Sequence, residues 1–369
     1  MKRAGNLMAE IADRENLLLA FWKAQRGKRA ASEVVRFRAR LEEELAALRQ
    51  ELLDGPFVPG GCASFTIHDP KERVICAAPF RDRVAHHALM NRCHDVFEAY
   101  QIHDSYACRT GKGTHRAVLR ARAFAGRFAY CLKLDVRRFF DSIDHEVLRG
   151  LLRRRFKDRR VLEIFDAIIG SYETAPGKGV PIGNLTSQYF ANHYLGTLDH
   201  FVKEKLRCRG YVRYMDDFLL FHDEPGPLKT WLREVSAFLE GELRVSLKPP
   251  CLVPLPRGVT FLGFRVFPGR VTLSRRSRLR FHRKLAAAQA KLASGEWDET
   301  ETARHVEPLI AFARHGASAG MRRRSVCRFS DAIQRPRTGS SGAATGTTTP
   351  RTAARRIGTT TTRRTGTTT

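Results

Sequence analysis

The sequence predicts an α+β fold, because helical spacing and strand alternation occupy different stretches of its 369 residues. Leucines recur at helical spacing over residues 41–52, and Gly55-Pro56 ends that run. Large apolar residues alternate with small or polar ones over 128–135, which is typical of a half-buried strand. The basic stretch 275–292 is the clearest helix of a mostly helical region near the C-terminus.

A tight hairpin is predicted over residues 212–221. Two apolar runs are separated there only by Asp216 and Asp217, so the turn would carry two carboxylates. Aspartate is common in ordinary turns, but a plain turn more often contains Asn-Gly or Asp-Gly. Asp135 ends the strand predicted upstream, and three carboxylates at strand ends favour a catalytic site.

The chemistry of these carboxylates favours hard divalent cations. A strand end with one carboxylate beside a hairpin with two can hold two ions roughly 3.5–4 Å apart, as in phosphoryl transfer. Oxygen ligands select Mg²⁺ or Mn²⁺ over softer metals. Asp135 and Asp216 are expected to ligate both ions, with Asp217 as a supporting ligand.

The charge balance points to a polyanionic partner. Lys and Arg exceed Asp and Glu by 27, while the apolar content is too high for a disordered basic arm. Residues 331–369 are rich in Thr, Gly and Arg, with no acid from Arg335 onward, and this tail is predicted to be disordered. The apolar run at 17–22 is too short for a membrane span, so we expect no membrane association.

The eight cysteines are scattered singly, without a Cys-x-x-Cys pair. This usage predicts free thiols in a reducing cytoplasm, with neither a zinc site nor a disulfide framework.

Several blocks of the sequence, in the order of a known family, resemble reverse transcriptases. The resemblance covers about residues 71–268 and rests on seven blocks: 72–89, 105–115, 132–145, 179–199, 211–221, 239–249 and 259–267. It implies a right-hand polymerase with fingers, a ferredoxin/RRM-like palm and a helical thumb. The implied division is an N-terminal helical segment (1–55), fingers (56–127), palm (128–268) and thumb (269–330).

The fourth block departs from the usual family pattern. Most reverse transcriptases have Gln-Gly, three residues and then Ser-Pro, whereas this chain has Ile182 in place of Gln and Gln188 in place of Pro. The departure is similar to reverse transcriptases of diversity-generating retroelements, which copy a template-repeat RNA with errors at adenines. That likeness implies an adenine-mutagenised cDNA and, as a partner, a basic accessory variability protein.

The resemblance also implies roles for individual residues. The Val136 carbonyl would complete one metal site, and Phe140 would block a ribose 2′-hydroxyl, although core packing is its competing role because Phe139 is adjacent. Lys248 is a candidate for assisting pyrophosphate departure. The remaining candidates for contacting the deoxynucleoside triphosphate, the template RNA or the primer strand are Lys71, Arg73, Arg109, Lys112, Ile182, Gly183, Ser187, Gln188, Tyr214 and Met215.

Two alternatives remain open from the sequence. The first is an intron-type or retron-type bacterial reverse transcriptase, although neither an endonuclease segment nor a Val-Thr-Gly string follows the palm blocks. The second is a basic RNA-binding protein with an RRM-like palm. The second alternative leaves the three aspartates without a purpose, because carboxylates repel phosphate unless a cation intervenes.

Overall fold

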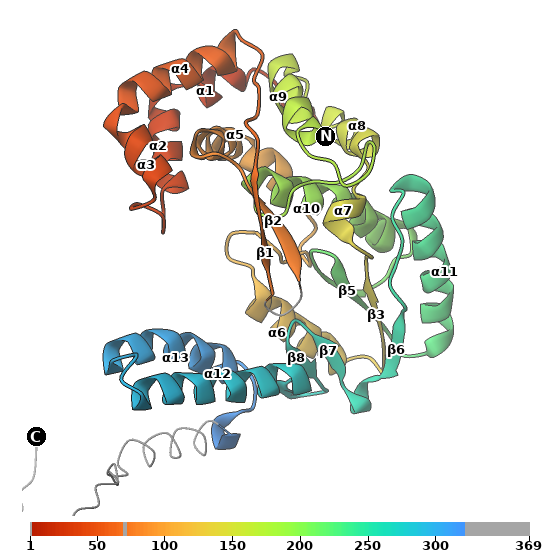
Figure 1. Cartoon of the computed structure of the whole chain (residues 1–369). Coiled ribbons are helices and arrows are strands. Elements are labelled where there is room, and N and C mark those ends of the chain that lie inside the picture. Colours follow the sequence, from red (N-terminus) through yellow and green to blue (C-terminus); the bar gives the residue numbers. More distant parts are fainter. Residues whose placement is uncertain (1, 69–71, 322–369) are drawn as a thin grey trace, which may run out of the picture.

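The computed structural model describes residues 2–68 and 72–321 (Figure 1). Lys71, residues 322–330 of the predicted thumb, the predicted tail 331–369 and Cys327 lie outside the described residues. Within the described ranges the fold mixes helices with three antiparallel sheets, as the sequence predicts. None of the described helices is long and apolar enough to cross a membrane.

Four helices form the N-terminal end, which lies far from the C-terminal helices in Figure 1: α1 (Met8–Ile11), α2 (Arg14–Ala24), α3 (Ser32–Ala39) and α4 (Leu41–Leu53). The Asp13 side chain accepts hydrogen bonds from two backbone amides at the start of α2, which fixes where that helix begins. The leucine stripe of α4 packs inward, and α2 lies along α5 (Phe80–Glu98). The stripe therefore serves packing.

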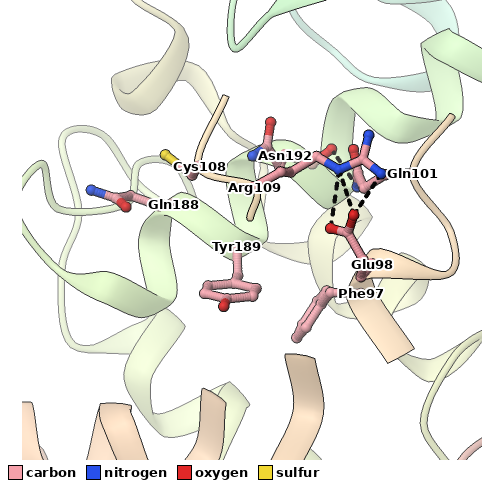
Figure 2. Close-up of a pocket in the computed structure, with 8 residues that line it drawn as sticks. All are labelled: Phe97, Glu98, Gln101, Cys108, Arg109, Gln188, Tyr189 and Asn192. Carbon is pink, nitrogen blue, oxygen red and sulfur yellow. Dashed lines mark hydrogen bonds and ion pairs between the residues drawn. The ribbon is translucent and has the colours of Figure 1, made fainter. Parts of the chain in front are cut away.

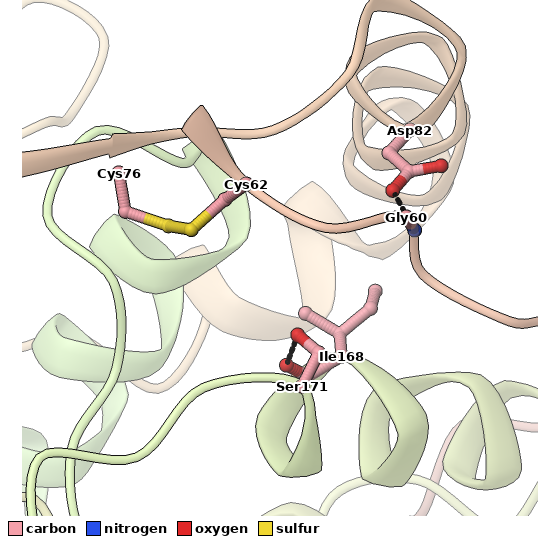
Figure 3. Close-up of a disulfide and its surroundings, with 6 residues drawn as sticks. All are labelled: Gly60, Cys62, Cys76, Asp82, Ile168 and Ser171. Carbon is pink, nitrogen blue, oxygen red and sulfur yellow. Dashed lines mark hydrogen bonds between the residues drawn. A yellow bond between two sulfur atoms is a disulfide. The ribbon is translucent and has the colours of Figure 1, made fainter. Parts of the chain in front are cut away.

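The hairpin of β1 (Ala63–Ile67) and β2 (Arg73–Ala77) stands apart from the central sheet. Cys62 and Cys76 form a disulfide at its base, with Cα atoms 5.5 Å apart (Figure 3). The prediction that all cysteines are free thiols is wrong for this pair. Strand pairing brings the two residues together across a sequence separation of 14, which a search for closely spaced cysteines does not detect.

The central sheet has the strand order β4-β5-β3-β6 and is antiparallel throughout. Its strands are β3 (Tyr130–Asp135), β4 (Gly210–Tyr214), β5 (Asp217–His222) and β6 (Cys251–Pro254). Helices separate β3 from β4, and α11 (Pro225–Glu242) separates β5 from β6. The chain thus follows the βαββαβ order of ferredoxin-like sheets.

Helices cover both faces of this sheet. Leu132 and Leu134 pack into a core with α10 (Leu185–His200) and α11, whereas Cys131 packs into a second core with α6 (Thr114–Ala125). The predicted half-buried strand therefore has buried residues on both faces, namely Cys131, Leu132 and Leu134. Tyr130 at its amino end, and Lys133 and Asp135 towards its carboxyl end, are half-buried. The remaining helices here are α7 (Phe139–Ser142), α8 (His145–Arg153), α9 (Arg159–Gly170) and the π-helix η1 (Phe201–Lys205).

A smaller sheet joins the central sheet to the C-terminal helices. It contains β7 (Val259–Phe261), β8 (Phe264–Val266) and β9 (Val271–Leu273), after the short helix η2 (Leu255–Arg257). Two helices follow it and lie side by side, α12 (Arg275–Ala293) and α13 (Glu299–Arg314) (Figure 1). The predicted basic helix 275–292 coincides with α12, which the Ser274 side chain caps.

Candidate active site

The three predicted carboxylates meet at one edge of the central sheet. Asp135 is the last residue of β3, Asp217 is the first residue of β5, and the two are paired across the strands. Tyr214 pairs with Asp217, so the two-residue turn is Met215-Asp216. The predicted turn was therefore wrong by one residue, because Asp217 is held in the sheet by its pairing with β3.

Backbone hydrogen bonds connect this turn to the end of β3. The Val136 amide donates to the Asp216 carbonyl at 3.1 Å, and the Lys248 amide donates to the Asp135 carbonyl at 2.8 Å. Met215 has a φ of 55°, in the left-handed region that a two-residue hairpin turn requires at its first position. Asp216 is thus held beside Asp135 by main-chain contacts. Tyr214 lies beside the turn, where its hydroxyl accepts a hydrogen bond from Thr114.

Two of the three carboxylates, Asp216 and Asp217, have raised pKa values. Burial raises the pKa of Asp216, and the charge of Asp135 raises it further. Burial also raises the pKa of Asp217 to about 6, with a smaller contribution from the other two carboxylates, whereas Lys133 opposes the shift. One oxygen of Asp217, Oδ1, is buried and has no hydrogen-bond partner. The site therefore holds more negative charge than its neighbours neutralise.

Two lysines partly balance that charge. The Lys133 ammonium donates to Asp217 Oδ2 at 3.0 Å, and the Lys248 ammonium pairs with Asp135 Oδ1. Lys133 was not among the predicted site residues, although strand alternation places it on the same face as Asp135, two residues away. Across residues 2–68 and 72–321, no three metal-ligating side chains converge into a complete metal site. The raised carboxylate pKa values and the unpaired Asp217 oxygen nevertheless fit a divalent cation.

The hairpin of β1 and β2 contacts the loop before α10, which carries the predicted nucleotide-binding residues Ile182 and Gly183. The Cys76 amide donates to the Ile182 carbonyl at 2.9 Å. Gly183 has a φ of 124°, and a Cβ built there would lie 3.0 Å from both the Cys76 carbonyl oxygen and the Ile75 side chain. Arg73 is on the same strand, and its charge lowers the pKa of Asp216. Arg73 therefore lies near enough to Asp216 for its charge to act there, and Ile182 and Gly183 contact the strand that carries Arg73.

The remaining predicted substrate-binding residues differ in how far their side chains are buried. Phe139 and Phe140 lie on the short helix α7 rather than on a strand; Phe139 is buried and Phe140 half-buried. Phe140 is thus the better placed of the two to meet a substrate. Ser187 is only 1 % exposed inside α10, so the prediction that it faces nucleotide or template is wrong in this structure. Its neighbour Gln188 lines a small cavity.

Figure 2 shows this cavity between α5, α10 and the segment at residues 108–109. Arg109 is directed into the protein there: its guanidinium pairs with Glu98 at 2.6 Å and donates to the carbonyls of Ile102 and Ser105. These contacts oppose the predicted phosphate contact, because most of the guanidinium's donors already have acceptors within the protein. Lys112 is half-buried, and its ammonium donates to the His103 carbonyl at 2.8 Å.

Comparison with known proteins identifies the family. The reverse transcriptase (RNA-dependent DNA polymerase) family model matches residues 68–266, more than half of the chain. Protein YkfC of Escherichia coli strain K12 is 24% identical over 282 residues, which cover 63% of this chain and 73% of YkfC. The group II intron-encoded protein LtrA of Lactococcus lactis is 25% identical over 218 residues, which cover 56% of this chain and 36% of LtrA.

Among solved structures, telomerase from Candida albicans aligns with 75% of this chain and 55% of its own, at 12% identity and a TM-score of 0.45. The chain spans only about a third of LtrA's length. The family match itself includes Asp135, Asp216 and Asp217. The chain belongs to the reverse transcriptase family, whose members are RNA-dependent DNA polymerases.

Proposed function

We propose that the edge of the sheet at Asp135, Asp216 and Asp217 is the polymerase active site, where a primer strand is extended with deoxynucleotides on an RNA template. The observation that carries this proposal is the pairing of Asp135 with Asp217 beside the Met215-Asp216 turn. The raised pKa of Asp216 supports it, because a carboxylate that is buried and lies near a second carboxylate favours a bound cation.

Mg²⁺ or Mn²⁺ would be held by Asp135, Asp216 and Asp217, with the Val136 carbonyl as a further ligand. Such ions supply Lewis-acid activation of the primer hydroxyl and neutralise the triphosphate. The protein's own contribution is positional. Lys133 and Lys248 balance the carboxylates, and Arg73 supplies positive charge from β2.

The surrounding elements suit the division of a right-hand polymerase. We assign residues 56–127 to the fingers, 128–268 to the palm and 269–330 to the thumb. The hydrogen bond between the Cys76 amide and the Ile182 carbonyl supports this, because it joins the β1–β2 hairpin to the loop before α10. Arginines on α12 line an open groove that also includes His68 from the hairpin, which suits a nucleic-acid backbone.

The assignment of the active site is tested with Asp216→Asn, which keeps the size of the side chain and removes its charge. We expect primer extension to be abolished while RNA binding is largely retained. Asp223→Asn is the matched control, because Asp223 is exposed just beyond β5. Retained extension by Asp216→Asn would exclude this site, whereas equal loss in both variants would indicate a general effect of removing acidic charge.

We further propose that the chain serves a diversity-generating retroelement and copies a template-repeat RNA with errors at adenines, together with a basic accessory protein. Ile182 in place of Gln and Gln188 in place of Pro support this assignment. Ile182 has no side-chain donor or acceptor, so the site loses a polar contact on which discrimination between nucleotides depends. The Ile182 carbonyl accepts a hydrogen bond from the Cys76 amide on β2, so the loop before α10 is held against the β1–β2 hairpin.

The fidelity proposal is tested by sequencing cDNA made on one adenine-rich template. Ile182→Gln should lower the adenine error rate, whereas Ile182→Leu, which stays apolar, should leave it high. The accessory protein is included if the locus encodes one. An unchanged error rate in Ile182→Gln removes this residue from the explanation.

A group II intron-type enzyme is the second candidate, and the similarity to LtrA favours it. The two functions differ in the product. A uniformly low error rate in the native complex would support the intron-type function, and errors confined to template adenines would support the retroelement. The DNA around the gene provides an independent test, since paired repeats that differ only at adenines accompany the retroelement.

A further inference from the structure

A fully buried ion pair lies beneath the carboxylate turn. Arg213 on β4 and Asp199 on α10 are both 0% exposed. The guanidinium binds the carboxylate through two nitrogens, with Nε 2.7 Å from Oδ1 and Nη2 2.6 Å from Oδ2. The Tyr211 hydroxyl donates to the same Oδ1 at 2.8 Å. This geometry leaves the guanidinium little freedom to rotate.

The third nitrogen of Arg213 contacts the turn itself. Nη1 donates to the Met215 carbonyl at 3.1 Å and to Asn192 Oδ1 at 3.2 Å. Nη2 also donates to Gln101 Oε1 at 3.3 Å. Asn192 and Gln101 border the cavity in Figure 2, so α10 and the segment that follows α5 both contribute partners. Each nitrogen of the side chain therefore has an acceptor in the protein.

The Met215 carbonyl is a sensitive point for such a contact. Met215 has a positive φ of 55°, which a residue with a side chain adopts only when its surroundings enforce it. Its carbonyl belongs to the peptide that leads directly into Asp216. A contact at this oxygen consequently constrains the orientation of that peptide and the position of the carboxylate that follows.

We propose that Arg213 is a positioning residue for polymerisation: its guanidinium, anchored by Asp199, holds the Met215 carbonyl and thereby orients Asp216. Helix α10 begins next to the Ile182-Gly183 loop and carries Asn192 and Asp199 farther along. The same helix thus follows the Ile182-Gly183 loop directly and contacts the Met215-Asp216 turn indirectly, through Arg213. The inference rests on the proposed role of Asp216.

The alternative is that the buried ion pair only attaches β4 to α10 and does not position Asp216. The variant Arg213→Lys distinguishes this structural role from the positioning role. Lysine keeps the charge beside Asp199, but a single ammonium lacks the planar fork needed to bind Asp199 and the Met215 carbonyl together. We expect kcat to fall by about tenfold or more and the half-saturating Mg²⁺ concentration to rise by about threefold, because small displacements of reacting groups are costly. KM for the primer-template should be unchanged.

Tyr211→Phe is the matched control. It removes another buried hydrogen bond to Asp199 and leaves every contact of Arg213 with the turn. It should lower the melting temperature without moving kcat or the Mg²⁺ dependence. If Arg213→Lys does not fold, Asp199→Asn takes its place with the same expected changes, since asparagine has the same shape but weakens the anchor.

The outcomes distinguish this inference from the proposed function. An active Asp216→Asn would refute the active-site assignment whatever Arg213 does. An inactive Asp216→Asn together with a destabilised Arg213→Lys of normal kcat and Mg²⁺ dependence overturns the positioning role alone. An equal shift in Mg²⁺ dependence for Tyr211→Phe also overturns it, since the effect would then follow from stability.

Discussion

Replacing Gly183 with alanine is expected to weaken the contact between the β1–β2 hairpin and the loop before α10. The new Cβ would lie 3.0 Å from the Cys76 carbonyl oxygen and the Ile75 side chain, at a φ of 124°. The unfavourable backbone conformation, together with loss of the neighbouring hydrogen bond from Cys76 to Ile182, costs about 2–4 kcal/mol. Urea unfolding should show this loss in the free energy of unfolding.

The same variant should raise KM for deoxynucleotides in primer extension, because the hairpin that carries Arg73 would shift relative to the carboxylates. Gly177→Ala is the matched control: Gly177 also has a positive φ, 68°, but a Cβ there meets no atom within 4 Å. Equal losses of stability in the two variants would refute the reasoning, since the contact with β2 would then contribute nothing. So would a Gly183→Ala protein with native stability and native KM.

Three further predictions concern pH, redox state and salt. Burial lowers the pKa of His86 from 6.5 to about 3, so between these pH values only the unfolded chain binds the proton, and the free energy of unfolding should fall by about 1.4 kcal/mol for each unit of decreasing pH. In urea titrations over this range, the dependence of the free energy of unfolding on pH should be smaller by one proton in His86→Leu. Reduction of the Cys62–Cys76 bridge should lower the free energy of unfolding by about 3 kcal/mol, whereas Cys62→Ser should be insensitive to reductant in the same urea assay. RNA binding should weaken steeply as the salt concentration rises. Removal of residues 335–369 deletes seven arginines and takes the charge from +27 to +20, but it should change primer extension little; a large loss of extension would show that the tail contributes.

Local periodicity was enough to predict the elements that bear the site. The alternation ending at Asp135 predicted β3, and the apolar runs flanking Asp216-Asp217 predicted a hairpin. Both signals depend on which side chains face the core, and neighbouring residues determine that. The exact turn was not predictable, because the pairing of Asp217 with Asp135, 82 positions away, decides the register.

The predictions for Cys62, Cys76 and Arg109 differ from the structure for a related reason. Composition and spacing cannot reveal that strand pairing brings Cys76 close to Cys62, or that Arg109 has Glu98 and two carbonyls as partners. In a strongly basic chain, the sequence around most arginines does not distinguish those that bind phosphate from those that bind other parts of the protein. Burial and the available acceptors separate structural arginines from those that can reach phosphate.

The sequence by itself determined the family, the order of its blocks and the three carboxylates, since these are carried by short contiguous motifs. Only the tertiary structure decided how the carboxylates are held. Lys133, Lys248 and Arg213 obtain their partners from other strands, helices and loops, and each partner is selected by distance in the folded protein. A buried charge is stable only where the packed fold supplies such partners, so this information resides in the packing and not in any local motif.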